Sequence, residues 1–262
     1  MYLQIEHKTR YVYESLVDYT IQYLRMTPQS GFGQHVKHWD LRVNGKLLPH
    51  VDAHGNRIHT LVIDSPHQEI NITAYGEVET DLDMVPQFEP LAPTVYLRIT
   101  PLTMVDDALR QLAQQTLGQK GTDTSSLDAL VEAIRDHVRY SRGATNIHTS
   151  AIEAYNKGEG VCQDHAHIFI ACCRYVGVPA RYVSGYLFTE DGHLVESHAW
   201  ADAWIAGQWH SFDVSNGQRT NDIHVRLAVG LDYQDACPIS GIRRGGGNEQ
   251  MQVKVQMSQS QQ

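Results

Sequence analysis

The sequence predicts an α+β protein, with an antiparallel β-sandwich domain followed by a core in which helices pack on an antiparallel sheet. Three observations predict this fold class. Side chains alternate with a period of two over residues 1–82, prolines interrupt residues 83–101, and apolar residues at helical spacing begin only after them. A chain of 262 residues is long enough for two modest domains with buried cores.

Residues 1–82 are expected to form a small β-sandwich of about six or seven short strands. The alternation is clear over residues 19–24, and Asn44-Gly45 between two apolar runs is a hairpin signal. Residues 83–101 contain repeated prolines, which break both helices and strand ladders. This segment is therefore expected to be a linker between domains.

Residues 102–247 are expected to form the second domain. Helices are predicted over residues 103–117, 125–140 and 150–156. The segment that follows Cys162 is apolar on nearly every side from Ala166 onward, which is typical of a buried helix. Strands are predicted next, over residues 180–188, 197–205 and 208–214. Residues 248–262 are rich in Gln and are predicted to add a strand and a flexible tail.

The composition disfavours several classes of function. A formal net charge of −9 repels phosphate backbones, so nucleic acid is not an expected partner. The N-terminus lacks the pattern of a signal peptide, and no apolar stretch is long enough to span a membrane, so we expect a cytoplasmic protein. Because the sequence has no CxxC pair and no acidic calcium loop, we expect no metal and no cofactor. In a reducing compartment all four cysteines should be free thiols.

Cys162 lies where a glycine-rich segment, residues 157–160, meets the buried helix. The unpaired N–H groups of a first helical turn create a positive potential that stabilises a thiolate and can form part of an oxyanion hole. Gly160 is expected to leave room for a substrate. The alternative is that Cys162 is a small buried hydrophobe, the usual role of a free cysteine. We favour that role for Cys172, Cys173 and Cys237, since nothing nearby activates them.

His198 and Asp213 lie on two predicted strands that Ala206-Gly207 joins into a hairpin. With a two-residue loop, these two side chains lie on one face of the sheet as diagonal neighbours. The opposite face carries small apolar residues that suit packing on the Cys162 helix. A structural histidine and a turn carboxylate are the alternatives. In acyl transfer a thiol attacks, a histidine moves the proton and a carboxylate orients the imidazole, so Cys162, His198 and Asp213 form a candidate triad.

Several segments resemble the bacterial transglutaminase-like superfamily, whose members are often described as cysteine proteases: Gly160–Asp164, Gly177–Tyr186, Ser197–Trp200, Trp209–Asp213 and Ala228–Tyr233. The strand-rich N-terminal third is similar to the β domain that precedes the core in these bacterial proteins. The resemblance covers nearly the whole chain and implies a papain-like core with Cys162, His198 and Asp213 as catalytic residues. Two positions depart from the family pattern: His165, where an aromatic such as Phe is expected, and Val214-Ser215, where Pro-Thr is commoner.

Four functions remain open at this point. The first is a thiol hydrolase that cleaves a peptide or another amide through an acyl-thioester. The second is a protein-glutamine transglutaminase, in which an amine resolves the same thioester. Exclusion of water separates the two, and Trp200, Trp204 and Trp209 are candidate cleft walls, although aromatic strand residues are more often core.

The third function is a non-catalytic binding module on the same core. The fourth is a metal protein, suggested by 15 histidines but disfavoured because His165 and His167 do not share a helix face. Tyr140 and Gln163 are candidates for the second oxyanion donor. The substrate, the fate of the thioester and the oligomeric state do not follow from the sequence.

Overall fold

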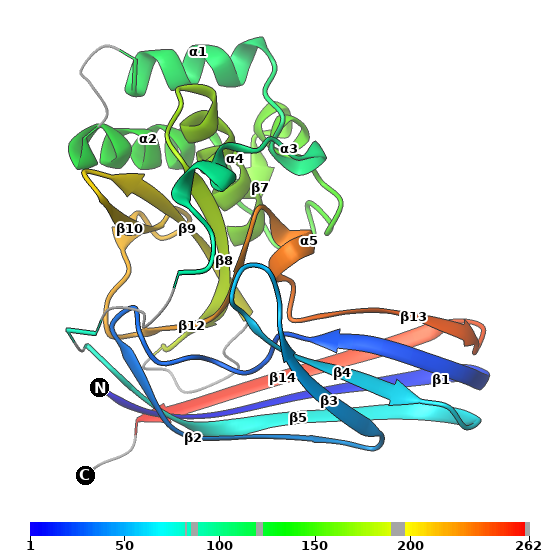
Figure 1. Cartoon of the computed structure of the whole chain (residues 1–262). Coiled ribbons are helices and arrows are strands. Elements are labelled where there is room, and N and C mark those ends of the chain that lie inside the picture. The colour runs from blue at the N-terminus through cyan, green and yellow to red at the C-terminus, as the bar shows by residue number, and fades with distance from the viewer. Residues whose placement is uncertain (82, 85–88, 119–122, 190–196, 260–262) are drawn as a thin grey trace.

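The computed structural model describes residues 1–262 apart from 82, 85–88, 119–122, 190–196 and 260–262. A long-stranded antiparallel β domain lies beside a core of helices and a second sheet (Figure 1). The predicted α+β class is therefore confirmed. Within the described residues, the helices are too short or too polar for any of them to cross a membrane.

The β domain is built around one strand, β1 (Tyr2–Leu24), which is 23 residues long. Its other strands are β2 (Gln34–Val43), β3 (Lys46–Val51), β4 (Arg57–Ile63), β5 (His67–Thr80), β13 (Ile239–Gly245) and β14 (Glu249–Gln259). The first half of β1 pairs with β5 and β14, and its second half pairs with β4 and β13. The predicted sandwich is therefore corrected in one respect: both halves share β1, so it is one seven-stranded sheet folded into a nearly closed barrel.

The Asn44-Gly45 turn joins β2 to β3, but these two strands do not pair as a hairpin, so that prediction is wrong. The Asn44 side chain donates to the carbonyl of Glu69 and accepts from the N–H of Asn71, both at 2.9 Å. Asn44 thereby continues the pairing of β2 with β5, while β3 pairs with β4 at the opposite edge. The local turn signal was right, and tertiary contacts decided which strands pair.

The end of the chain returns to the β domain. The core was expected to extend to residue 247, yet β13 pairs with β1 from Ile239 onward. The strand predicted beyond residue 248 is present as β14, which pairs with β1 over Leu3–Tyr13. Both strands cover the second edge of β1, which would otherwise expose its backbone groups. The expected flexible tail falls partly on residues 260–262, which lie outside the described residues.

The core holds helices α1 (Asp107–Thr116), α2 (Thr124–His137), α3 (Ala151–Lys157), α4 (Cys162–Tyr175) and α5 (Tyr233–Ala236). Its sheet has the order β11 (Gln218–Arg219), β10 (Gln208–Asp213), β9 (Ser197–Ile205), β8 (Ala180–Leu187), β12 (His224–Gly230). A short parallel pair, β6 (Arg139–Tyr140) and β7 (Glu159–Gly160), precedes α4. Asp106 and Asp123 cap α1 and α2, so both helices begin at the next residue.

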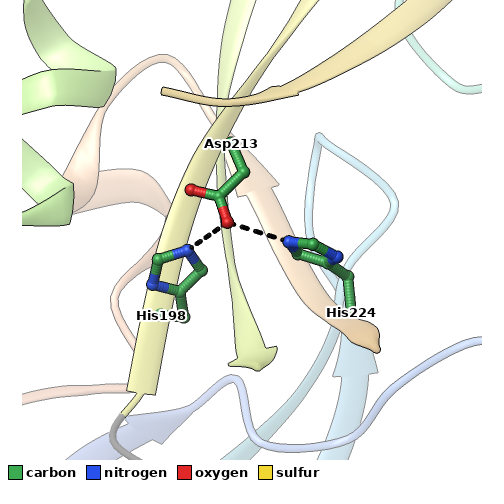
Figure 2. Close-up of side chains that lie close together, drawn as sticks. All are labelled: His198, Asp213 and His224. Carbon is green, nitrogen blue, oxygen red and sulfur yellow. Dashed lines mark hydrogen bonds and ion pairs between the residues drawn. The ribbon is translucent and has the colours of Figure 1, made fainter. Parts of the chain in front are cut away.

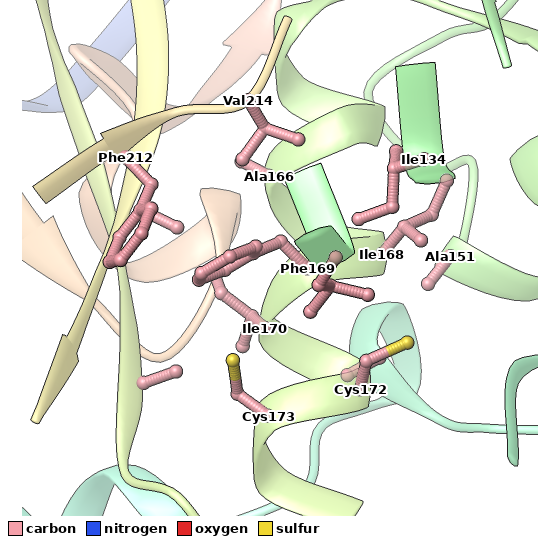
Figure 3. Close-up of a cluster of buried hydrophobic side chains, with 14 of the residues drawn as sticks. Ile134, Ala151, Ala166, Ile168, Phe169, Ile170, Cys172, Cys173, Phe212 and Val214 are labelled. Atoms are coloured by element: carbon pink, nitrogen blue, oxygen red, sulfur yellow. The ribbon is translucent and has the colours of Figure 1, made fainter. Parts of the chain in front are cut away.

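Helix α4 lies in the middle of the main hydrophobic core (Figure 3). Phe169 of α4 and Phe212 of β10 pack with ring centroids 5.0 Å apart. Ala199, Ala201 and Ala203 of β9 belong to the same buried cluster, as their small size and shared face predicted. These contacts fix the start of α4 relative to β9 and β10.

The segment between the domains packs on the core within its described part. It forms two short 3-10 turns, η1 (Pro93–Leu97) and η2 (Pro101–Thr103). Tyr96 is 1% exposed, and its carbonyl accepts a hydrogen bond from Arg174 Nε of α4 at 2.9 Å. This part of the predicted linker is thus a structural component of the core.

Candidate active site

Cys162 is the first residue of α4, and its side chain is half-buried at a cleft of about 370 Å³. Asp164 caps this helix start, because its carboxylate accepts the N–H of Val161 at 2.7 Å and the hydroxyl of Thr145 at 2.6 Å. A Cβ added at Gly160 would lie 2.7 Å from Cβ of Asp164. We expected Gly160 to leave room for a substrate. It instead leaves room for the carboxylate of Asp164 that caps the helix.

His198 and Asp213 come together as the hairpin argument predicted. Gln208 pairs with Ile205 and Phe212 with Ala201, so the two-residue loop fixes the register. His198 Nε2 lies 2.9 Å from Asp213 Oδ2, and the His198 side chain is 9% exposed. The contact is short, but the ring N–H is not well aligned with Oδ2, so it is better described as an ion pair than as a linear hydrogen bond.

The charges of the two residues support each other. Burial alone would lower the pKa of His198, but contacts with Asp213 and Cys162 outweigh burial and raise that pKa to about 10. Burial alone would raise the pKa of Asp213, but the contacts with His198 and His224 hold that pKa well below its usual range. An imidazolium therefore lies between a carboxylate and the thiol side of the cleft at neutral pH.

His224 is the residue that the sequence analysis missed. It begins β12, is 6% exposed, and places Nε2 2.9 Å from the same Asp213 oxygen that His198 contacts. Figure 2 shows Asp213 between the two imidazoles. In the sheet β9 and β8 lie between β10 and β12, so no local pairing rule brings His224 to Asp213. Only the return of the chain after β11 does so.

His198, Asp213 and His224 could in principle hold a metal, since their ligand atoms lie within 4.8 Å of one another. Both imidazoles, however, point at one carboxylate oxygen at 2.9 Å. A metal needs its ligand atoms at about 2.0–2.2 Å and would have to replace both contacts. Asp213 Oδ2 also accepts the side-chain amide of Asn216 at 2.8 Å, so the cluster fits a hydrogen-bonded unit better than a metal centre.

Tyrosines line the cleft beside Cys162 and His198, namely Tyr140, Tyr182 and Tyr233. The tryptophans considered as walls do not line it. Trp200 is 1% exposed in a small cluster with Val183 and Val229, and Trp204 packs edge-on against Trp209. Gln163, one candidate oxyanion donor, also lines the cleft, as does the other candidate, Tyr140.

The first turn of α4 offers further donors to the cleft. The N–H groups of Asp164 and His165 both donate to the carbonyl of Val161. The N–H groups of Cys162 and Gln163 come before them in the turn and cannot have partners within the helix. The other three cysteines are buried, and burial raises the pKa of each thiol.

The fold places the thiol of Cys162 at a helix start, in the same cleft as the imidazole of His198, which contacts Asp213. Residues 110–214 match the family model for the transglutaminase-like superfamily, and residues 3–79 match that for the bacterial transglutaminase-like N-terminal region. The chain belongs to the transglutaminase-like superfamily and carries this bacterial N-terminal region.

Individual relatives cover almost the whole chain. The Mycobacterium leprae protein ML0607 is 28% identical over an alignment of 275 positions that covers 98% of each chain. The Mycobacterium tuberculosis protein Rv2569c is 28% identical over 274 residues, covering 91% of this chain and 86% of the relative. A solved structure, the "Putative Cysteine Protease from Cytophaga hutchinsonii", is 26% identical, with a TM-score of 0.79 and coverage of 98% of this chain and 90% of that one.

Proposed function

We propose that this protein is a cysteine-nucleophile hydrolase that cleaves a peptide or another amide through an acyl-thioester. Cys162 is the nucleophile, His198 the general acid and base, and Asp213 the group that orients His198. The observation that carries this proposal is the position of His198, which contacts both Asp213 and Cys162 at the start of α4. The likeness to the "Putative Cysteine Protease from Cytophaga hutchinsonii" supports the same reaction class.

The proposed reaction has two halves. The thiolate of Cys162 attacks the amide carbonyl carbon, and the N–H groups of the first turn of α4 stabilise the resulting oxyanion. His198 gives its proton to the leaving amine, the C–N bond breaks, and the thioester remains on Cys162. In the second half His198 takes a proton from water and the hydroxide attacks the thioester carbonyl carbon. The C–S bond breaks, the carboxylic acid leaves, and the thiolate of Cys162 and the imidazolium of His198 are restored.

We favour hydrolysis over amine transfer because of the residues that line the cleft. Transfer to an amine requires that water be kept from the thioester. The large tryptophan side chains that could exclude water pack elsewhere. Besides His198, the aromatic residues that line the cleft in the described chain are tyrosines, and one of them, Tyr140, is 45% exposed. Protein-glutamine transglutamination stays the alternative, since its first half is identical.

Alkylation tests the nucleophile. Iodoacetamide at about pH 6 should label Cys162 first, because the other three thiols are buried and hard to ionise. His198→Ala should slow this labelling, and Cys173→Ser is the control that should leave it unchanged. Equal labelling of the four cysteines, or none at Cys162, would contradict the proposed triad. Peptide hydrolysis and amine incorporation, assayed side by side with Cys162→Ala as the blank, then separate the two fates of the thioester.

A further inference from the structure

His165 is buried in α4, one turn after Cys162, and only 1% of it is exposed. Both of its ring nitrogens contact backbone carbonyl oxygens. Nδ1 lies 2.9 Å from the oxygen of Val161, and Nε2 lies 3.0 Å from the oxygen of Val138. This is the position where the family resemblance leads one to expect an aromatic without a titratable ring.

These two contacts define the protonation state of the ring. A carbonyl oxygen can only accept a hydrogen bond, and a neutral imidazole has only one N–H to donate. A neutral His165 would therefore direct one nitrogen lone pair at a carbonyl oxygen in a buried place, which is costly. The imidazolium donates to both oxygens and satisfies both contacts.

Burial disfavours a charge on His165, and two features of its surroundings oppose that penalty. Val138 is the C-cap of α2, where the carbonyl end of the helix dipole is negative. Asp164, the preceding residue of α4, is fully buried; burial raises its pKa, while hydrogen bonds from Thr145 and Val161 and the charge of His165 oppose that rise.

The other groups near the two contacted carbonyls carry little net charge. Tyr140 of β6 places its ring 6.2 Å from that of His165. On the same short strand pair, Arg139 of β6 forms an ion pair with Glu159 of β7. His137, at the end of α2, is engaged with the carbonyl of Tyr155. Asp164, next to His165 in the chain, is the carboxyl group whose pKa the charge of His165 lowers.

We propose that His165 is a positioning residue held as an imidazolium, which ties the start of α4 to the end of α2 and adds positive charge beside the thiolate of Cys162. Cys162 and His165 are three residues apart and so are neighbours on one face of the helix. The second part of this inference rests on the proposed function. The first part, the charged state, does not.

The charged state can be measured directly in the wild-type protein. Long-range ¹H–¹⁵N spectra of histidine-labelled protein, with His165 assigned from the spectrum of His165→Phe, should show both of its nitrogens protonated at neutral pH. A spectrum with one protonated and one bare nitrogen at that pH would overturn the inference. This readout needs no catalytic activity, so it stands apart from any failure of the hydrolase proposal.

The effect on Cys162 is measured by the pH dependence of its alkylation. His165→Phe should raise the pH of half-maximal alkylation by about one unit, the size expected when a nearby opposite charge is removed. His165→Gln keeps a hydrogen-bond donor without the charge and should give a similar shift. A wild-type midpoint in both variants would limit His165 to packing and overturn this part.

His167 supplies the matched control on the same helix. It is fully buried, burial lowers its pKa to about 3, and its Nε2 accepts the N–H of Tyr233 at 3.1 Å, so it is neutral. His167→Phe removes a buried histidine but no charge, and should leave the alkylation midpoint in place. An equal shift in this control would attribute the effect of His165→Phe to damaged packing and would count against the inference. Loss of selective Cys162 labelling in the wild type would instead contradict the proposed function.

Discussion

At the scale of single residues, the geometry of the site depends on the several donors that surround the carboxylate of Asp213. Asp213 Oδ2 contacts His198, His224 and the side chain of Asn216, while Oδ1 accepts the hydroxyl of Ser215 at 3.2 Å and the N–H of Asn216 at 3.3 Å. The carboxylate is fully buried, so these donors replace its water. Its orientation toward His198 is set by all of them together.

His224 is predicted to matter for catalysis through Asp213 and not through the substrate. His224→Ala removes a hydrogen bond to a buried carboxylate, so kcat/KM for amide hydrolysis should fall by roughly ten- to a hundredfold. His224→Gln can place an amide N–H toward Asp213 and should recover part of the loss. A shift in the basic limb of the pH–rate profile should accompany the loss, because Asp213 tunes His198.

Steady-state kinetics across pH, with alkylation of Cys162 as a second readout, would check this prediction. His210 is a suitable control, since its side chain contacts only Gln208 among the hydrogen bonds of the described residues, and His210→Ala should have little effect. A His224→Ala variant with an unchanged pH profile and rate would reduce His224 to a packing role.

At the scale of secondary-structure elements, the free edge of β12 is closed by two side chains of the β domain. Gln34 donates to the carbonyl of Arg226 and accepts its N–H. Asn56 does the same with Val229, at 2.7 and 2.8 Å. Both amides are buried and act as a fragment of a neighbouring strand. They connect the two domains where β12 would otherwise be an open edge.

Asn56→Ala should therefore lower the free energy of unfolding by about 1–3 kcal/mol, because it leaves two buried backbone groups of Val229 without partners. Urea denaturation at neutral pH measures this change. Asn71→Ala is the matched control, since among the described residues the Asn71 side chain bonds only to Glu69 on its own exposed strand surface. Equal stability of Asn56→Ala and wild type would mean that water replaces the amide at this edge.

At the scale of the whole molecule, the two domains share a buried interface. Leu3 and Ile5 of β1 and Val255 and Met257 of β14 pack against Tyr186 of β8 in one hydrophobic cluster. His7 lies at this interface, with Nδ1 2.8 Å from the hydroxyl of Tyr186. Burial lowers the pKa of His7 to about 4, as it lowers that of His167 in the core to about 3.

Acid should destabilise the protein as these buried histidines become protonated. Between about pH 6.5 and their folded pKa values, the unfolded chain binds protons that the folded chain does not, so stability falls as pH falls. For His7 alone the loss approaches about 3 kcal/mol near pH 4, at about 1.4 kcal/mol for each unit of pKa difference.

Two other groups fix the limits of this pH range. The pKa of Asp202 is lowered to about 2 because Arg226 and Arg181 outweigh its burial, so its stabilising effect is lost only in stronger acid. His198 behaves in the opposite way, since its pKa is raised to about 10; its contribution is complete below about pH 6.5 and is lost as pH rises through about 10. Maximum stability should therefore lie near neutral pH.

Urea unfolding at several pH values between about 7.5 and 4.5 measures the acid slope. His7→Gln removes one titrating group from the interface and should flatten that slope, whatever its effect on stability at neutral pH. A free energy of unfolding that stays constant over this range would contradict the assignment of His7 and His167 as buried neutral groups.

Local features of the sequence were enough to predict the fold class, helices α1 to α4 and strands β8 to β10 of the core, and the register that brings His198 to Asp213. These features depend on local periodicity, capping and a two-residue turn, which act over a few neighbouring residues. The position of Cys162 at a helix start also follows from local sequence, because the glycine-rich segment and the apolar run on either side of it are adjacent in the chain. The expected cytoplasmic location stays a prediction.

The other features depend on tertiary contacts. The pairing of β2 with β5 and the return of β13 and β14 to β1 join residues that are distant along the chain, and the contact of His224 with Asp213 joins strands that β9 and β8 separate in the sheet. The charge of His165 likewise depends on a carbonyl 27 residues away. Such contacts form because apolar surfaces and unpaired backbone groups must be covered once the helices and strands exist. No local pattern in the sequence shows which element will cover which surface.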